Sequence, residues 1–487
     1  MPQSRFLPLR FTGASALVFL LSACSAPDLG PRPEPIAPAR IAAARSLASP
    51  TASAWPAGDW WRGYGDAQLD GLIEEGLKGS PDIAAAAARF RRALGMAQAA
   101  GAPLLPSLDA QGQARLEKQS YNVGIPAQFV PKGWQDVGQA ALNLSYDIDI
   151  WGRNRASLAA ATSEAEAARL EQEQARLMLT TAIASAYADL ARLHAERDVL
   201  ASALDIRLAT RKLVSNRVAI GLDTRAELKQ ADAGVPQARA DLAAAEESIA
   251  LAHNQIAALI GAGPDRGLSI ARPALSALAP PALPARVTTD LIGRRPDIAA
   301  ARARVEAAAS RIKVARADFY PAVRLGALIG VQSLGLSELA KSGSTYGNAG
   351  PAISLPIFHG GALKGQYRGA RGTYDEAVAS YDGTVLAAYR EVADAVTGRR
   401  SAVERLAQSR QALADSEEAY AIARKRYEGG LSTYLNVLTS EEKLLQARRS
   451  VADLDARMFA LDIALVRALG GGFTVSPENI AKDPPNG

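Results

Sequence analysis

The side chains that most often perform chemistry in proteins are scarce in this chain of 487 residues, which has three histidines and one cysteine. His194 and His253 fall in patterns typical of long helices, and His359 falls at an expected strand-to-helix turn, with no ligand spacing between them. A Gly-x-Ser-x-Gly nucleophile motif and a Walker-type phosphate loop are both missing from the sequence. We therefore expect no enzyme, no metal site and no cofactor.

The single cysteine, Cys24, has a different chemistry. It closes the sequence Leu21-Ser22-Ala23-Cys24, which follows two arginines and an apolar core over residues 14–21, the charge order of a secretory signal. These four residues resemble the bacterial lipobox, in which the cysteine is acylated and becomes the mature N-terminus. We expect a signal peptide over residues 1–23 and a lipid anchor at Cys24; an ordinary signal peptide with an incidental cysteine is the alternative. Ser25, rather than Asp, next to Cys24 favours sorting to the outer membrane.

Composition excludes several other classes of protein. Hydrophobic residues make up 48% and charged residues 22%, so the chain can bury a core and is not disordered. The 55 basic residues alternate with 50 acidic ones, which is not the pattern of a nucleic-acid-binding protein. Alanine-rich runs with interspersed charges indicate long helices packed closely side by side.

The chain contains two copies of one pattern. Residues 81–106 align with 296–321, and residues 217–261 align with 426–470, with matched Pro, Gly and Arg landmarks and no gaps. Chance matching of alanine-rich helices does not explain those landmarks, so we expect a tandem duplication. The first copy has a longer middle segment, which we place at Lys118 to Asp136; its counterpart is Gly335 to Gly347.

Each copy predicts the same elements in the same order. A helix of about 20 residues starts at Pro81 or Pro296. Two strands follow, then an uninterrupted helix of about 65 residues and a return helix that begins after a reversal at Gly221 or at Gly430. Pro236 should bend the first return helix. The strands are expected from period-two alternation at Leu108, Ala110, Gly112, Ala114 and Leu116, at Leu142, Leu144, Tyr146, Ile148 and Ile150, at Val323, Leu325, Ala327, Ile329 and Val331, and at Ile353, Leu355 and Ile357.

Strands of about ten residues are long enough to cross a bilayer when tilted. Four strands cannot close a barrel, and open strand edges are not tolerated in lipid, so several copies of the chain must contribute to one barrel. Two copies would give a barrel filled with side chains, and three would leave room for solute. The count by itself favours three only weakly.

The motifs resemble the TolC and OprM type of outer-membrane efflux protein, in its lipoprotein branch. The resemblance covers nearly the whole mature chain. The residues that carry it, besides the lipobox, are Trp60-Trp61, Asp66-Ala67-Gln68-Leu69, Ser80-Pro81-Asp82-Ile83, Tyr146 to Arg153, Arg295-Pro296-Asp297-Ile298, Phe319-Tyr320-Pro321, Leu355-Pro356-Ile357-Phe358 and the two reversals. It implies a mainly α protein with transmembrane β-structure: a homotrimer whose 12-stranded β-barrel, four strands from each protomer, continues into a 12-helix α-barrel.

The resemblance also implies a domain organisation. After the signal peptide come a lipidated tether over residues 24–54 and an N-terminal equatorial segment over 55–80. Repeat 1 then spans 81–261, an equatorial linker 262–295, repeat 2 296–470 and the C-terminal tail 471–487.

In such ducts the reversals dock on a periplasmic adaptor and the neighbouring helix ends form a gate. The docking positions carried over are Arg217, Gly221, Leu222, Thr224, Arg426, Gly430, Leu431 and Thr433. Helix capping alone explains the glycines equally well. The gate positions are Glu227, Tyr427, Leu435, Asn436, Thr439 and Glu442. Asn436 and Thr439 stand where family members carry rings of aspartate, and Ser432 replaces an arginine, so we expect a closed state that rests on different contacts.

The expected function is that of the outer-membrane exit duct of a tripartite efflux system of the RND type. The duct would be passive and would export drugs or other small toxic compounds. Its partners would be a periplasmic adaptor (membrane fusion) protein, an inner-membrane pump and outer-membrane lipid, with no nucleic acid. A type I secretion duct and a heavy-metal efflux duct are alternatives. A lipid-anchored coiled-coil scaffold without a channel is the alternative of a different class.

Overall fold

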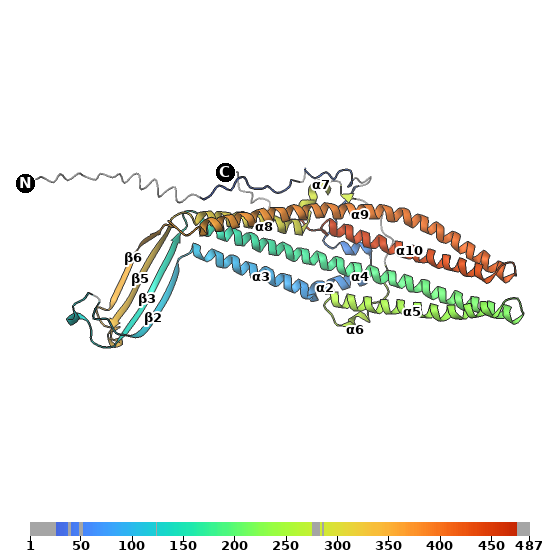
Figure 1. Ribbon diagram of the computed structural model, residues 1–487, viewed down its shortest axis with the longest axis horizontal. Helices are drawn as coiled ribbons and strands as arrows, with labels where there is room; N and C mark the ends of the chain where they lie inside the picture. Colours follow the sequence, from blue (N-terminus) through green and yellow to red (C-terminus); the bar gives the residue numbers. More distant parts are fainter. Residues whose placement is uncertain are drawn as a thin grey trace, which may run out of the picture. The chain divides into compact units, whose positions relative to one another are not determined.

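The computed structural model describes residues 26–37, 40–47, 52–122, 124–274, 283–284 and 287–474 (Figure 1). The predicted signal peptide, Cys24 and the tail beyond Thr474 lie outside these residues. Within the described ranges, no helix combines the length and hydropathy needed to cross a membrane. The chain divides into a sheet unit (residues 1–35, 90–167 and 301–381) and a hairpin unit (residues 36–89, 168–300 and 382–487).

One order of elements occurs twice along the chain, as the alignment of the two halves predicts. A medium helix leads into two strands, a long helix and a return helix. The first set is α3 (Pro81–Gly101), β2 (Ser107–Glu117), β3 (Gln135–Ile148), α4 (Arg153–Ala219) and α5 (Arg225–Leu259). The second set is α8 (Pro296–Ala317), β5 (Ala322–Leu334), β6 (Thr345–Ser354), α9 (Ala362–Glu428) and α10 (Tyr434–Ala468). Helices α4 and α9 each have 67 residues, about 100 Å of helix.

The four strands form one antiparallel sheet in the order β2-β3-β5-β6. Three predicted strand positions are wrong. Ile150 lies in a turn after β3, and Leu355 and Ile357 follow the end of β6 at Ser354. The register explains the early end of β6, because Ser354 pairs with Ala322, the first residue of β5 after the proline that stops α8.

The sheet has an apolar face and a polar face, because side chains alternate along each strand. Cross-strand neighbours on the apolar face include Leu142 with Ile329 and Leu144 with Leu108. All four of these side chains are exposed in the single chain, Ile329 by 68%. On the opposite face, rows of amides run across the strands, such as Gln113, Gln139 and Gln332. Among the described residues, the sheet thus combines an exposed apolar face with edge strands, β2 and β6, that pair with no further strand.

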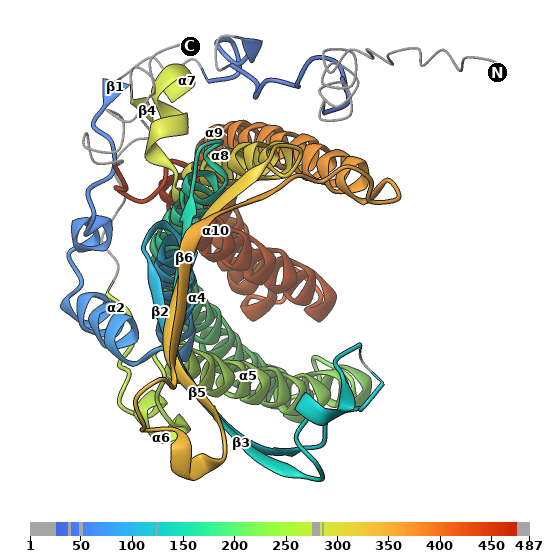
Figure 2. The ribbon, with the colours of Figure 1, turned by 90° about the vertical axis from the view of Figure 1, so that its left-hand side faces the viewer.

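Within the hairpin unit, short elements form a belt beside the helices: β1 (Ala52–Ser53), η2 (Trp60–Tyr64), α2 (Ala67–Gly79), α6 (Pro264–Gly267), β4 (Leu283–Pro284), α7 (Val287–Asp290) and η5 (Leu291–Arg294). Strand β1 pairs in parallel with β4. Figure 2 shows α2, β1, β4 and α7 on one side of α5 and α10. Leu72 and Ile73 of α2 are buried in one core with Ile183 of α4 and Ile256 of α5.

A hydrogen-bonded cluster fastens the belt to α4. Asp66 caps α2 by accepting from the amides of Gln68 and Leu69, and it also accepts from the Tyr187 hydroxyl at 2.7 Å. The Gln68 amide bonds to the backbone N–H and carbonyl of Ala271 in the linker. Burial raises the pKa of the Asp66 carboxyl, but the hydrogen bonds from Tyr187 and three backbone amides outweigh it, so the pKa is lowered.

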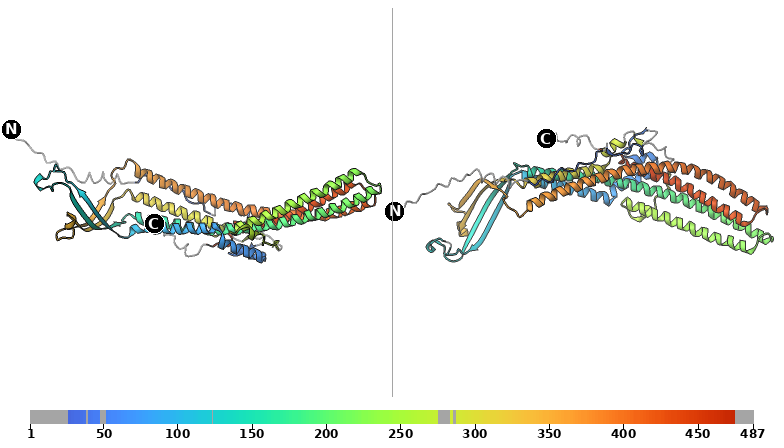
Figure 3. Two further views of the ribbon diagram at one scale, coloured as in Figure 1. Left: turned by 90° about the horizontal axis from the view of Figure 1, so that it is seen from below. Right: turned by 45° about the horizontal axis from the view of Figure 1, so that its top comes forward.

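The return helices end at the belt and begin at the reversals. Helix α5 continues through Pro236, which has no N–H to donate to the carbonyl of Asp232. In the second copy, Leu445 occupies the equivalent position in α10 and keeps this donor. Figure 3 shows each long helix beside its return helix up to the two reversals.

Candidate functional site: the helix reversals

The two reversals have the same backbone geometry. Gly221 has φ = 76° and Gly430 has φ = 74°, in the left-handed region that glycine adopts without strain. The following residue closes each turn, since the Leu222 N–H donates to the Arg217 carbonyl at 2.8 Å and the Leu431 N–H donates to the Arg426 carbonyl at 2.8 Å. This is a standard left-handed helix C-cap, so the glycines are explained by chain reversal alone.

The starts of the return helices differ from each other. Thr224 and Glu227 form a reciprocal capping box on α5, in which the Glu227 carboxylate accepts from the Thr224 N–H at 2.6 Å. On α10 the cap residue is Thr433, and its side chain makes no capping bond. Asn436 takes the position of Glu227 and donates instead to the Ser432 hydroxyl at 2.9 Å. The first return helix is therefore capped more firmly than the second.

A buried ionic cluster joins the two hairpins. The Arg217 guanidinium bonds to both carboxylate oxygens of Asp223, at 2.9 and 3.3 Å, and to the Tyr427 carbonyl at 2.9 Å. The Tyr427 hydroxyl donates to the Asp223 carboxylate. Burial, together with this bond, raises the pKa of the Tyr427 hydroxyl, while the bonds of Asp223 raise the pKa of Arg217. Both shifts favour a charged Arg217 and a neutral Tyr427.

Apolar side chains support this cluster. Val214 and Tyr427 are fully buried, and they pack with Ala231, Tyr434 and Val437 from the two return helices. Because these residues come from α4, α5, α9 and α10, one small core holds all four helix ends.

A second ion pair crosses from α4 to α10. The Arg207 Nε lies 3.1 Å from Oε1 of Glu441, whose side chain is only 2% exposed. That oxygen has no hydrogen-bond partner among the described residues, so the contact is an ion pair without good hydrogen-bond alignment. Burial raises the pKa of the Glu441 carboxyl; Arg207 lowers it by a smaller amount and Glu442 adds a small increase.

The structure places the predicted docking residues in two different environments. Leu222 and Leu431 are exposed by 60% and 73%, and Arg426 is also exposed. Arg217 is buried and paired with Asp223, and its role as a docking residue stays a prediction. Its neighbours Gly221 and Thr224 are exposed at the turn, as Gly430 and Thr433 are in the second copy.

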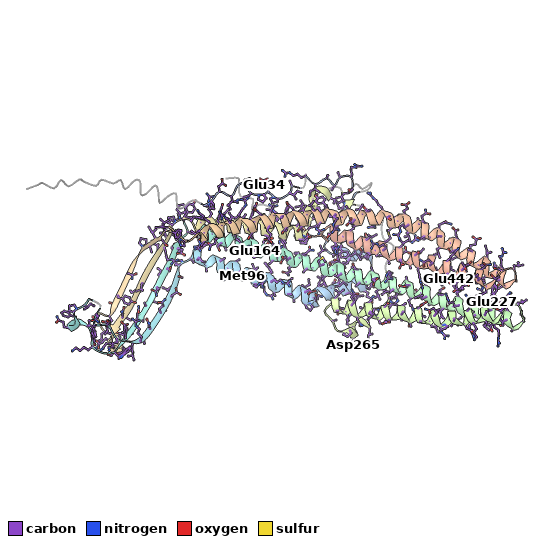
Figure 4. All side chains as sticks on the ribbon, in the orientation of Figure 1. Glu34, Met96, Glu164, Glu227, Asp265 and Glu442 are labelled. Atoms are coloured by element: carbon purple, nitrogen blue, oxygen red, sulfur yellow. The ribbon has the colours of Figure 1, made fainter. Side chains whose placement is uncertain are left out.

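The predicted gate residues are likewise divided. Leu435, Asn436, Thr439 and Glu442 are exposed on α10. Tyr427 is buried against Asp223, while Glu227 is used by the helix cap, so the acid that Tyr427 meets is Asp223 and not Glu227. Figure 4 shows Glu227 and Glu442 on the return helices towards their reversal ends.

Three residues of the site, Asp223, Arg207 and Glu441, were not predicted from the sequence. The sequence pattern could have indicated Glu441, because this residue interrupts a series of apolar residues at heptad spacing. The structure buries the members of that series, Tyr434, Val437 and Leu444. No sequence pattern indicated Asp223, apart from its position next to Thr224.

The two histidines of the first hairpin also lie close together, although no sequence pattern predicted this contact. The rings of His194 and His253 lie 6.4 Å apart between α4 and α5. Burial lowers the pKa of both imidazoles, so each favours its neutral form.

Comparison with known proteins agrees with this architecture. The family model described as outer membrane efflux protein matches residues 72–262 and 287–471. The multidrug resistance outer membrane protein MdtP of Escherichia coli is 30% identical over 484 residues, 97% of this chain and 98% of MdtP. The fusaric acid resistance protein FusA of Burkholderia cepacia is 36% identical over 64% of this chain, a match that spans 59% of FusA.

Solved structures show the same fold. The crystal structure of the outer membrane protein VceC of Vibrio cholerae superposes with a TM-score of 0.81 and 46% identity, over 86% of this chain and 100% of VceC. The outer-membrane channel OprN superposes with a TM-score of 0.82 and 26% identity, over 92% and 99%. The chain therefore belongs to the outer membrane efflux protein family and is an outer-membrane channel component of an efflux system.

Proposed function

We propose that three copies of this chain form one duct. The observation that carries the proposal is the four-stranded sheet with an exposed apolar face and unpaired edges at β2 and β6. Strand directions alternate across the sheet, so β6 of one copy would run antiparallel to β2 of the next. The two edges also match in length, with 10 and 11 residues. Three sheets would close a barrel of about twelve strands, wide enough for an aqueous lumen.

The helices would continue the duct into the periplasm. The 21 residues of α3 and the 35 of α5 together approach the 67 of α4, and α8 with α10 matches α9 in the same way. Each protomer would thus supply four columns of helix to a 12-helix barrel, with the belt around it.

The reversal end would be the gate and the docking site. In the closed state, the Arg217–Asp223–Tyr427 cluster holds the two hairpins of a protomer together. Exposed apolar side chains at the turns, Leu222 and Leu431, offer a surface to a periplasmic adaptor. Energy and substrate choice would come from an inner-membrane pump, for which the RND type is our proposal. The lumen would pass drugs or other small toxic compounds passively.

The chain would reach the outer membrane as a lipoprotein. Lipid modification of the Cys24 thiol and cleavage before Cys24 would anchor the protein without a spanning helix. Replacing Cys24 with serine should abolish acyl labelling, and labelling that persists in this variant would show that the lipobox assignment is wrong.

Leu144→Arg and Asn143→Arg provide a matched test of the barrel. The two residues are adjacent in β3 and point to opposite faces. Arginine on the lipid face near the membrane centre costs about 2–4 kcal/mol, whereas arginine in the lumen is hydrated. We expect Leu144→Arg to abolish trimers and conductance in planar bilayers, and Asn143→Arg to keep trimers and alter ion selectivity. Equal effects of the two variants, or a monomeric wild type without conductance, would contradict the proposal.

A separate experiment is needed to find which compounds the duct exports. A deletion strain complemented with the intact chain should regain resistance to part of a panel of antibiotics, detergents and metal salts. Regained resistance to metal salts alone would favour the heavy-metal alternative.

A further inference from the structure

The histidines of this chain occupy two kinds of environment. His194 of α4 and His253 of α5 lie on helices that run side by side (Figure 3). Their ring centres are 6.4 Å apart, with the ring planes at 46° to each other. His359 lies between β6 and α9 and is exposed. The structure thus brings together two imidazoles that are 59 positions apart in the chain and leaves the other in solvent.

Each ring of the pair has a nitrogen without a partner. Nε2 of His194 and Nε2 of His253 are buried, and neither has a hydrogen-bond partner among the described residues. Buried polar atoms in folded proteins nearly always have a partner, so each of these nitrogens requires an explanation. One ligand shared by the two rings would satisfy both atoms together.

The distance between the rings fits a metal ion held between them. An imidazole nitrogen binds a transition metal at about 2 Å and lies about 1 Å from its ring centre, so two imidazoles on opposite sides of one ion have their centres about 6 Å apart. The observed separation of 6.4 Å agrees with this arrangement. Two ligands in a line leave each ring free to turn about the line, so an angle of 46° between the planes is compatible with it.

The pair lies under the belt. Gly267 of α6 packs directly on His253, because a Cβ added to this glycine would lie 2.8 Å from the His253 carbonyl oxygen. Neighbours of the histidines along α4 and α5, Leu193 and Ile256, are buried in the core that includes α2. Since both Nε2 atoms are shielded from solvent, water does not complete a larger shell of ligands around an ion at this place.

The donor set selects the kind of ion. Among the described residues there is no group of three or more His, Cys, Asp or Glu side chains that could hold a metal, so the chain offers two ligands here. Zinc in proteins takes four ligands, and calcium and magnesium prefer oxygen. Imidazole suits copper, and Cu(I) is stable with two nitrogen ligands in a line.

The charges around the pair also favour a monovalent ion. Arg272, Asp198 and Arg197 act on His194, and Asp198 pairs with the two arginines at 2.6 and 3.3 Å. This trio has one net positive charge, so a divalent ion would meet about twice the repulsion that a monovalent ion meets. Burial lowers the pKa of both imidazoles, which keeps them in the neutral form that binds a metal.

We propose that His194 and His253 bind one Cu(I) ion through their Nε2 atoms, and that this ion ties α4 to α5 beneath the belt. The site lies within one chain, so it does not depend on how many copies form the duct. The bound ion is structural and is distinct from the cargo.

The first test is a titration of the purified full-length protein in detergent with Cu(I), without oxygen and against the competing chelator bicinchoninate. Wild type should take one Cu(I) per chain from the chelator. Loss of an outer-shell partner alone weakens metal binding about ten- to a hundredfold, so His194→Asn and His253→Asn should each lose about a hundredfold or more. His359→Asn is the matched control and should bind like wild type. No binding by wild type, or full binding by both His194→Asn and His253→Asn, overturns the site.

X-ray absorption of the copper-loaded wild type gives a measurement that needs no variant. The expected result is two nitrogen neighbours at about 2 Å from copper and no sulfur neighbour. A sulfur neighbour, or four neighbours around the copper, overturns the proposed ligands. Stoichiometric binding of Zn(II) in place of Cu(I) overturns the choice of ion.

Thermal unfolding tests the tie between the helices. An ion that binds only the folded chain stabilises it, so saturating Cu(I) should raise the Tm of wild type and of His359→Asn. The Tm of His194→Asn should not respond to Cu(I). An unchanged Tm in copper-loaded wild type contradicts the structural role of the ion.

Discussion

The guanidinium carbon of Arg217 lies 4.5 Å from the centre of the Tyr427 ring, although 210 positions separate the two residues in the chain. The same guanidinium pairs with Asp223, and the tyrosine hydroxyl donates to that carboxylate, so one contact ties the first reversal to the long helix of the second hairpin. The pseudo-equivalent of Arg217 in the second copy is Arg426, which is exposed. The duplication has thus kept an arginine at both positions while only one of them joins the hairpins.

This asymmetry provides a matched pair of variants. Arg217→Ala leaves Asp223 and the Tyr427 carbonyl buried without their main donor, a loss of about 1–3 kcal/mol. We expect the closed gate to be weakened, with open events about tenfold or more frequent in single-channel recordings. Arg426→Ala should gate like the wild type. If both variants behave alike, the buried cluster is not what holds the gate closed.

The ion pair of Arg207 and Glu441 predicts a destabilised variant that a second substitution rescues. Arg207→Ala leaves a buried carboxylate unpaired and should cost about 3–5 kcal/mol of stability, seen as a clear fall in Tm. Adding Glu441→Gln removes the unpaired charge and should restore most of that loss. Glu442→Gln, which changes the exposed neighbour, should restore nothing.

The same pair predicts the sign of a pH effect. Burial raises the pKa of Glu441, so its protonated form favours the folded state, and this contribution is present at low pH and lost as pH rises through the folded pKa. The deficit of Arg207→Ala should therefore shrink as the pH is lowered from about 8 to about 5. A deficit that is constant over this range would show that Glu441 does not titrate in the folded protein.

For the belt, Asp66 predicts the opposite pH dependence, in which stability falls as the pH is lowered. Hydrogen bonds lower the pKa of its carboxyl, so the stability that it contributes is present above the unfolded pKa and lost as pH falls through the folded value. Asp66→Ala removes the α2 cap and the acceptor of Tyr187, and should cost about 2 kcal/mol. Limited proteolysis should then cut near the linker faster than in wild type. Glu74→Gln on the exposed side of α2 is the control.

Replacing glycine with alanine should lower stability at the two reversals and raise it inside α9. Gly221 and Gly430 have positive φ, and a Cβ added at either position would meet no atom within 4 Å, so alanine there should cost about 1–2 kcal/mol through backbone strain alone. Gly369 lies inside α9, also with open space around it, and alanine should stabilise the helix by about 0.5–1 kcal/mol. Thermal unfolding of the three variants measures both signs. A stabilising effect of alanine at Gly221 would contradict the assigned turn.

What the sequence by itself determined is local. Period-two alternation located the strands of the four-stranded sheet, Pro81 and Pro296 marked helix starts, and the two glycines marked the reversals, because backbone sterics and side-chain periodicity act within a few residues. The resemblance of the motifs to efflux proteins was confirmed by the family match. The sequence also indicated the duplication, because matched residues at a constant offset can be recognised without the structure.

The tertiary structure decided which side chains meet. The end of β6 depends on its register with β5, so Leu355 and Ile357 leave the sheet despite their alternating pattern. Tyr427 meets Asp223 and not Glu227, and Arg217 is buried, because the facing sides of packed helices depend on their rotation and offset. A pairing between residues so far apart in the chain is set by those global variables, which no local pattern specifies.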